Sequence, residues 1–220
     1  MLMASMSQRS KATWSPWALE YRRTPGRYVF GTDPSAFALD ISWLVRPGDH
    51  VLDLGCGEGR DSVFFAELGG VVTGIDLSAE GLEKARQLAR ARKVHVNWIE
   101  GPMTDTLPAA RFDVIFSCGS IHYVPRHSRI ALFDRLKAMT QSAGLHAHVV
   151  FTDRLVYEEK GEVVDYFTSG ELGESYRDWL TFKHRDDVIS CAQDGTVHGH
   201  SVEELVTIHP GWQAPPASAH

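Results

Sequence analysis

The chain of 220 residues has little cysteine, no long apolar run and no excess of positive charge. Its three cysteines, Cys56, Cys118 and Cys191, lie far apart without a C-x-x-C pair, which favours reduced thiols over a disulfide framework. The longest apolar runs are much shorter than the ~20 residues that a membrane-spanning helix needs. The N-terminal residues show no apolar stretch typical of a secretory signal. We therefore expect a cytoplasmic protein without membrane contact.

The charge balance also excludes one class of partner. Lysine and arginine number 22 against 28 aspartates and glutamates, for a formal net charge of -6. Nucleic-acid-binding proteins usually carry a basic face, so we expect no nucleic-acid partner. The composition, 43% hydrophobic and 23% charged, is typical of one α/β domain with a sizeable core. We expect a monomer or a homodimer.

One stretch combines an apolar run with closely spaced glycines. Val51 to Leu54 reads as a strand, and Gly55, Gly57 and Gly59 follow it at every second position before a helical pattern. A strand, a tight turn and a helix start bring bare backbone close to a nucleotide-like ligand. Arg60 stands where a dinucleotide loop, G-x-G-x-x-G, has its last glycine. The stretch therefore departs from the dinucleotide pattern.

With the acidic Asp53 leading in, this stretch resembles motif I of class I S-adenosylmethionine-dependent methyltransferases. The next predicted strand, Val71 to Ile75, ends in Asp76, about 20 residues past the glycine loop. A carboxylate there can accept hydrogen bonds from ribose hydroxyls and would repel a 2′-phosphate. Ser78 then supplies an N-cap for the following helix.

The end of the fourth predicted strand, Phe112 to Ser117, is a second place where a ligand is expected. In a doubly wound sheet this end lies beside the first strand, at the switch point where ligands bind. We expect Ser117 to face the methionine part of the cofactor. His122 and Tyr123 would then begin the substrate side.

The order of predicted elements indicates the fold class. Strands and helices alternate up to a fifth strand at Leu145 to Thr152, a helix is predicted at Glu171 to Leu180, and a final hairpin joins residues 188–192 to 198–208 through Asp194-Gly195. This order predicts an α/β fold, a doubly wound seven-stranded Rossmann-like methyltransferase sheet with a reversed C-terminal strand. His146 and His148 share one face of the fifth strand. We expect them to be packed structural residues and predict no metal site.

Three segments make up the predicted domain organisation. Residues 1–13 are expected to be a disordered N-terminus, residues 14–210 a single methyltransferase domain, and residues 211–220 a tail. Dense aromatic residues mixed with arginines mark residues 14–45. This segment is either a helix packed on the sheet or a lid over cofactor and substrate, and the sequence supports both interpretations.

The later part of the chain narrows the resemblance. Phe167 to Leu172, followed by Tyr176 and Trp179, resembles the tellurite-resistance and thiopurine methyltransferase-like group, as does the segment from Trp17 to Gly31. This resemblance implies methylation of small, soft nucleophiles such as thiols or chalcogen oxyanions. Relatives methylate oxygen or nitrogen on small metabolites. The His/Arg pair of the tellurite enzymes has no counterpart at residues 190–193.

The resemblance implies a set of site residues for S-adenosylmethionine and for a small-molecule acceptor. The expected cofactor-binding residues are Tyr21, Asp53, Gly55, Gly57, Gly59, Arg60, Asp76, Leu77, Met103 and Ser117. The expected substrate pocket is lined by Phe30, Tyr123 and Phe167. The family often binds the adenine amino group through an acidic residue, but Pro102 takes that place here. The contact therefore falls to Glu100, to Asp105 or to the backbone near Met103.

The mechanism depends on the acceptor. Methyl transfer is an in-line displacement at an activated sulfonium, so alignment and desolvation supply much of the acceleration. A hydroxyl or amine acceptor also needs a base, and His122, His198 and His200 are the candidate catalytic residues. Two other functions stay open, a nicotinamide-dependent oxidoreductase and a protein that binds S-adenosylmethionine without catalysis. Arg60 in the glycine loop argues against the first.

Overall fold

The structure is a computed structural model that describes residues 16–157, 164–192 and 197–211. The predicted disordered N-terminus, the Asp194-Gly195 turn and residues 212–220 of the predicted tail lie outside the described residues. Within the described part of the chain, no helix combines the length and apolar character that crossing a membrane requires.

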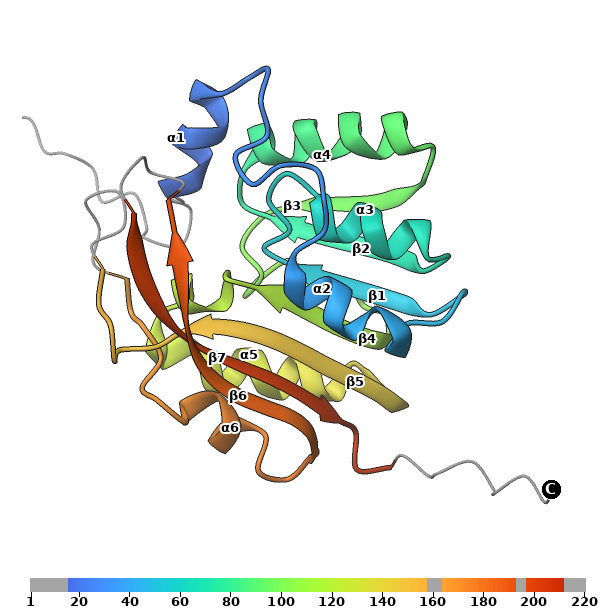
Figure 1. Cartoon of the computed structure of the whole chain (residues 1–220). Coiled ribbons are helices and arrows are strands. Elements are labelled where there is room, and N and C mark those ends of the chain that lie inside the picture. The colour runs from blue at the N-terminus through green and yellow to red at the C-terminus, as the bar shows by residue number, and fades with distance from the viewer. Residues whose placement is uncertain (1–15, 158–163, 193–196, 212–220) are drawn as a thin grey trace, which may run out of the picture.

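A seven-stranded sheet runs through the molecule in the order β3-β2-β1-β4-β5-β7-β6 (Figure 1). The strands β1 to β5 pair in parallel, whereas β7 pairs antiparallel with both β5 and β6. The predicted fold class, with its reversed C-terminal strand, is therefore confirmed. The strands are β1 (His50–Leu54), β2 (Val71–Asp76), β3 (Val96–Glu100), β4 (Phe112–Cys118), β5 (Thr140–Phe151), β6 (Leu180–Cys191) and β7 (His198–Ile208).

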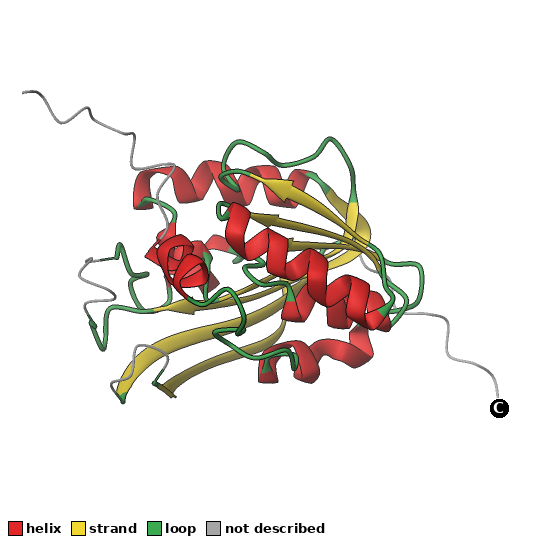
Figure 2. Cartoon of the chain, turned by 90° about the horizontal axis from the view of Figure 1, so that it is seen from above, coloured by secondary structure: helices red, strands yellow, loops and turns green. Residues whose placement is uncertain are grey.

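Helices cover both faces of the sheet (Figure 2). One apolar core packs α2 and α3 on one face, and a second core packs α5 and α6 on the other. The helix α1 lies beside α4. The helices are α1 (Pro16–Arg23), α2 (Ala36–Ile41), α3 (Arg60–Glu67), α4 (Ala79–Arg92), α5 (Arg126–Ala138) and α6 (Glu171–Ser175), with short 3-10 turns η2 (Ser42–Leu44) and η3 (Ile121–Tyr123).

The helix predicted at Glu171 to Leu180 is shorter than expected. α6 ends at Ser175, and β6 begins at Leu180, well before the hairpin arm predicted at residues 188–192. The reason is tertiary pairing, because the first residue of β6, Leu180, pairs with Ile208 at the end of β7. A strand that pairs along its whole length satisfies backbone groups that a local helix would otherwise satisfy.

The histidines on β5 form a buried network, as predicted for packed structural residues. His146 and His148 are fully buried, and the Tyr176 hydroxyl lies 2.6 Å from His146 Nδ1 and 3.0 Å from His148 Nε2. Burial lowers the pKa of His148 to about 3 and holds the pKa of His146 well below its usual range. Both rings are therefore neutral at physiological pH.

Candidate cofactor and acceptor site

The glycine loop after β1 has the backbone conformation that the sequence predicted. Gly55, Gly57 and Gly59 have φ angles of 69°, 53° and 84°, a region that side-chain-bearing residues rarely adopt. A Cβ on Gly55 would lie 2.3 Å from the Ser120 Cβ. A Cβ on Gly57 would lie 2.7 Å from the Tyr21 hydroxyl. Glycine is thus required both by conformation and by space.

Asp76 holds the glycine loop against the end of β2. Its Oδ2 accepts a hydrogen bond of 2.8 Å from the Gly57 amide, and its Oδ1 accepts one of 2.8 Å from the Ser78 amide. The Ser78 hydroxyl in turn caps α4 by accepting from the Gly81 amide at 3.0 Å. The carboxylate is therefore fixed in orientation, and it lines a cavity.

This first cavity measures about 360 Å³ and lies at the carboxyl ends of β1, β2 and β3. Leu77 and Met103, both predicted cofactor contacts, line it together with Pro102. Glu100 and Asp105, the acidic alternatives for the adenine contact, are not among its lining residues. The geometry therefore favours the backbone around Met103 over either carboxylate.

A second cavity of about 210 Å³ adjoins the first. Both are lined by Trp17, Gly55, Gly119 and Tyr123. The Trp17 indole N–H donates a hydrogen bond of 2.7 Å to the Tyr123 hydroxyl, so the two rings form a shared wall. The remaining lining residues of the second cavity are Phe30, Gly31, Asp53, Cys56, Gly57, Glu58, Arg60, Asp61, Cys118, Val149, Phe151, Ile189, Ser190, Cys191 and His200.

Asp53 contributes a buried carboxyl group to the second cavity. Burial, with a smaller effect from Asp61, raises its pKa to about 8. The Ser62 hydroxyl donates a hydrogen bond of 2.5 Å to Asp53 Oδ2. Arg60 lies nearby, where its guanidinium donates to the Phe30 carbonyl oxygen at 3.2 Å. A cation bound beside Asp53 would favour the ionised carboxylate.

The aromatic N-terminal segment makes two kinds of contact, and its role as a lid over bound ligands stays a prediction. Its helix α1 packs against α4, which is the structural role. It also places Trp17 in the wall of both cavities and Phe30 in the wall of the second, and the two rings lie 4.9 Å apart. The segment therefore covers the ligand-binding edge of the sheet.

Several predicted site residues lie behind the cavities and not in their walls. Tyr21 is buried and supports the loop at Gly57, while Ser117 is fully buried and bonds to His148 Nδ1 at 2.8 Å. Phe167, expected in the substrate pocket, is fully buried beneath the Arg129 guanidinium at 3.9 Å. Gly59 packs against Ala85. The structure thus corrects the expected positions of these residues, because tertiary packing turns them into the core.

The three candidate catalytic histidines also differ in whether they line a cavity. His122 is fully buried, stacks on Phe151 with ring centroids 4.3 Å apart and lines neither cavity. His200 lines the second cavity, and its Nε2 lies 2.9 Å from the Nε2 of His198. The structure therefore places His200 in the wall of the second cavity, with His198 in contact with it, and places His122 outside both linings.

Sequence reasoning missed Trp17, Cys118, Phe151 and Cys191 as cavity-lining residues. Trp17 was noted only as part of an aromatic segment. Cys118 ends β4, where the switch point could have indicated it. Phe151 ends β5, which pairs with β4, and Cys191 ends β6, which reaches the cavity through the β5-β7-β6 pairing, and no local signal marks either residue.

Comparison with known proteins agrees with this geometry. The family described as "Methyltransferase domain" matches residues 51–144, which span the glycine loop, Asp76 and the β4 switch point. Residues 51–144 are similar to a methyltransferase domain. The resemblance to class I S-adenosylmethionine-dependent methyltransferases is thereby confirmed, and S-adenosylmethionine is the cofactor that this assignment supports.

Individual relatives extend the comparison. The ribosomal protein L11 methyltransferase of Burkholderia thailandensis is 36% identical over 105 residues, which cover 46% of this chain and 34% of that protein. The chain spans about a third of the length of the curated relatives it matches. The similarity in sequence to these relatives therefore covers a little less than half of this chain.

Two solved structures share the fold over most of the chain. TehB from Haemophilus influenzae has a TM-score of 0.69 at 20% identity, covering 79% of this chain and 62% of that one. The 1,6-didemethyltoxoflavin-N1-methyltransferase of Burkholderia thailandensis, solved with S-adenosylhomocysteine and 1,6-didemethyltoxoflavin, has a TM-score of 0.64 at 23% identity, covering 88% and 87%. At these identities the likeness shows the fold, which includes the strands outside residues 51–144.

Proposed function

We propose that this methyltransferase domain transfers a methyl group from S-adenosylmethionine to a small-molecule nucleophile, a thiol or a chalcogen species. The observation that carries the proposal is the pair of adjoining cavities with Trp17 and Tyr123 in their shared wall. The first cavity suits the nucleoside, and the second suits the methionine part together with a small acceptor. A reagent that spans both would hold its reactive centre close to the wall between them.

The larger cavity supports the nucleoside part of the proposal. Asp76 presents a fixed carboxylate at the end of β2, where ribose hydroxyls can donate to it. Leu77 and Met103 offer apolar surface for the adenine ring. The methionine part would follow Gly55 and Gly57, whose bare backbone allows close approach, with its ammonium group near Asp53.

The smaller cavity supports the acceptor part. Its walls combine aromatic rings, Phe30 and Phe151, with the thiols of Cys118 and Cys191. Such walls exclude water and hold a compact, polarizable nucleophile in line with the sulfonium, which supplies much of the acceleration of methyl transfer. The resemblance to enzymes that methylate thiols and chalcogen oxyanions agrees with this chemistry.

His200 favours a second candidate, an O- or N-methyltransferase of a small metabolite. Hydroxyl and amine acceptors must lose a proton, and His200, in contact with His198, is the candidate catalytic histidine that lines the acceptor cavity. His122 lines neither cavity, so we no longer propose it as a base. Cytoplasmic location, a monomeric or homodimeric state and the absence of nucleic-acid partners stay predictions.

Calorimetric titration with S-adenosylmethionine and with S-adenosylhomocysteine tests the cofactor. We expect micromolar binding of both, weakened by Asp76→Ala, because the ribose contact and the loop support are both lost. The same protein is then offered small thiols, selenite and tellurite, followed by phenols and amines, and methylated product is measured by mass spectrometry. Absence of binding by the folded wild-type protein would refute the proposal. Turnover confined to phenols or amines would establish the second candidate instead.

A further inference from the structure

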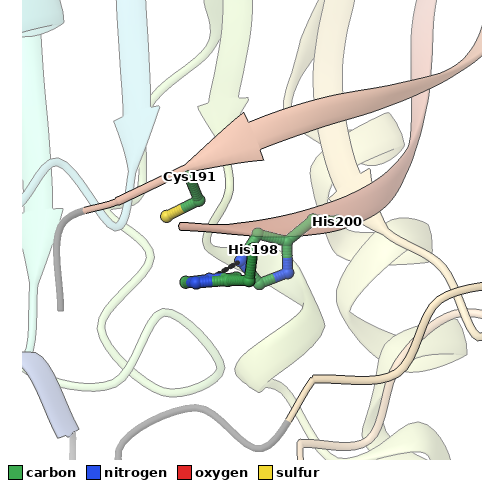
Figure 3. Close-up of side chains that lie close together, drawn as sticks. All are labelled: Cys191, His198 and His200. Carbon is green, nitrogen blue, oxygen red and sulfur yellow. Dashed lines mark hydrogen bonds between the residues drawn. The ribbon is translucent and has the colours of Figure 1, made fainter. Parts of the chain in front are cut away.

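Three side chains able to bind a metal meet at one end of the β6-β7 hairpin (Figure 3). The Sγ of Cys191 and ring nitrogens of His198 and His200 all lie within 4.8 Å of one another. The three residues are close in sequence, but their spacing matches no common metal-binding motif, and no metal site was predicted there. The strand pairing is what brings them together.

The register of the hairpin explains why the side chains converge. Cys191 on β6 pairs directly with His198 on β7, which places the two side chains on the same face of the sheet. His200 follows two residues later on the same strand and therefore shares that face. A slip of one residue would turn one arm's ligands to the opposite face.

We propose that Cys191, His198 and His200 bind a divalent transition-metal ion, with Zn²⁺ as the expected occupant. One thiolate and two imidazoles form a donor set that suits this borderline-soft ion. In tetrahedral coordination with Zn–N bonds of about 2.0–2.1 Å, two ring nitrogens stand about 3.3 Å apart. The His198 and His200 Nε2 atoms are 2.9 Å apart and would separate by a few tenths of an ångström, while the Cys191 Sγ, within 4.8 Å of the ring nitrogens, would move toward them to complete the site. The metal would replace the proton that the two rings share.

Aromatic packing holds both imidazole rings in place. Tyr157 stacks on His198 with ring centroids 3.5 Å apart and an interplanar angle of 3°. Phe151 stacks on His200 with centroids 4.2 Å apart and an angle of 18°. Rings restrained in this way lose little conformational freedom when they bind a metal, which favours the site.

The site borders the acceptor cavity, since Cys191 and His200 both line it together with Tyr123. Three protein ligands leave a fourth position for water or substrate, as in catalytic zinc sites. If the proposed function holds, on which this step rests, a thiol acceptor would bind there and release its proton to solvent. Its sulfur would then form a bond to the methyl carbon, while the carbon–sulfonium bond breaks and leaves its electron pair on S-adenosylhomocysteine.

Cobalt titration of the full-length protein, freed of metal by a chelator, tests the site without any cofactor. We expect one Co²⁺ per chain, with visible bands of tetrahedral cobalt and a near-ultraviolet thiolate-to-cobalt band. Cys191→Ser should lose the thiolate band, and His200→Ala should weaken binding by more than the roughly 10- to 100-fold that loss of an outer-shell partner causes. Cys118→Ser is the matched control, because this thiol also lines the cavity and lies outside the cluster.

The metal site and the proposed function are tested independently, because Co²⁺ binding and S-adenosylmethionine binding are measured separately. Folded wild-type protein that binds no Co²⁺ or Zn²⁺, or equal spectra for Cys191→Ser and Cys118→Ser, would overturn the metal site even if S-adenosylmethionine binds. A protein that binds Co²⁺ but not S-adenosylmethionine would support the metal site and refute the proposed methyl transfer. Addition of 2-mercaptoethanol should alter the cobalt spectrum through the open position, and an unchanged spectrum would overturn the acceptor role. Circular dichroism of each variant verifies its fold.

Discussion

Lys84 on α4 forms a buried ion pair with Glu58 of the glycine loop, with 2.7 Å between Nζ and Oε1. The same ammonium group donates to the Thr24 hydroxyl at 3.0 Å and to the Arg27 carbonyl oxygen at 2.9 Å. Glu58 Oε2 accepts from the Val29 amide at 2.7 Å. The pair therefore joins the N-terminal segment to the loop that lines both cavities, and the cofactor site depends on it.

We expect Lys84→Met to lower the free energy of unfolding by about 3–5 kcal/mol, because it leaves the Glu58 carboxylate buried without its partner. The double variant Lys84→Met/Glu58→Gln should recover part of this loss, since the amide oxygen can still accept from the Val29 amide. Chemical denaturation measures both. Arg177→Met, in an exposed pair with Glu174, is the control and should change stability by less than about 1 kcal/mol. Equal effects at the two sites would refute the structural role of the pair.

Gly55→Ala should weaken cofactor binding. The added Cβ would meet Ser120 at 2.3 Å in a backbone with φ of 69°, so the loop must move away from the cavity. We expect affinity for S-adenosylmethionine to fall roughly tenfold or more, which corresponds to about 1.4 kcal/mol or more. Gly170→Ala carries similar backbone strain, with φ of 85°, but its Cβ would meet no atom within 4 Å. It should lose stability and keep cofactor affinity, and loss of affinity in both variants would contradict the loop assignment.

Asp53 should make stability depend on pH. The folded carboxyl keeps its proton up to a pKa of about 8, whereas an unfolded aspartate loses it near pH 4. The folded state thus binds more protons in this interval, and the free energy of unfolding falls as pH rises toward 8. The buried histidines act in the opposite direction as pH rises through about 6.5, because their unfolded rings lose protons there that the folded rings do not hold, and this contribution is the same in an Asp53 variant.

Urea denaturation between about pH 6.5 and 8 measures this slope. Asp53→Asn should flatten it by up to about 1.4 kcal/mol per pH unit, since the amide keeps an acceptor for the Ser62 hydroxyl but has no proton to release. Identical slopes for the wild type and the variant would show that Asp53 is already ionised in the folded protein.

Tyr176→Phe should destabilise the fold by about 1–3 kcal/mol. The variant removes the hydroxyl that lies 2.6 Å from His146 Nδ1 and 3.0 Å from His148 Nε2, and both rings are fully buried. Thermal and chemical denaturation at neutral pH measure the loss. Tyr28→Phe is the control, because its hydroxyl makes a hydrogen bond of 3.1 Å to the Lys84 carbonyl oxygen at a partly exposed position. A smaller loss for Tyr176→Phe than for Tyr28→Phe would contradict the proposed network.

Local pattern was enough to predict several residues that line the cavities at the ends of β1 and β2. Gly55, Gly57, Asp76 and Leu77 follow strand ends within one βαβ unit, so their spacing along the chain determines their spacing in space. Parallel pairing of neighbouring strands brings such ends to one edge of a sheet. The matching family covers this same part of the chain.

The acceptor half depended on contacts that no local pattern records. Trp17 reaches Tyr123 across 106 residues of sequence separation, and Cys191 meets the glycine loop because the sheet order puts β7 and β6 beyond β5. Position then separated two buried residues that the sequence treated alike, since His200 lines the second cavity and His122 does not. The amino-acid sequence alone determined the fold class and the nucleotide-binding edge, because both follow from short-range periodicity and glycine conformation. Only the tertiary structure decided which side chains face the acceptor, because that depends on strand register and on packing between distant segments.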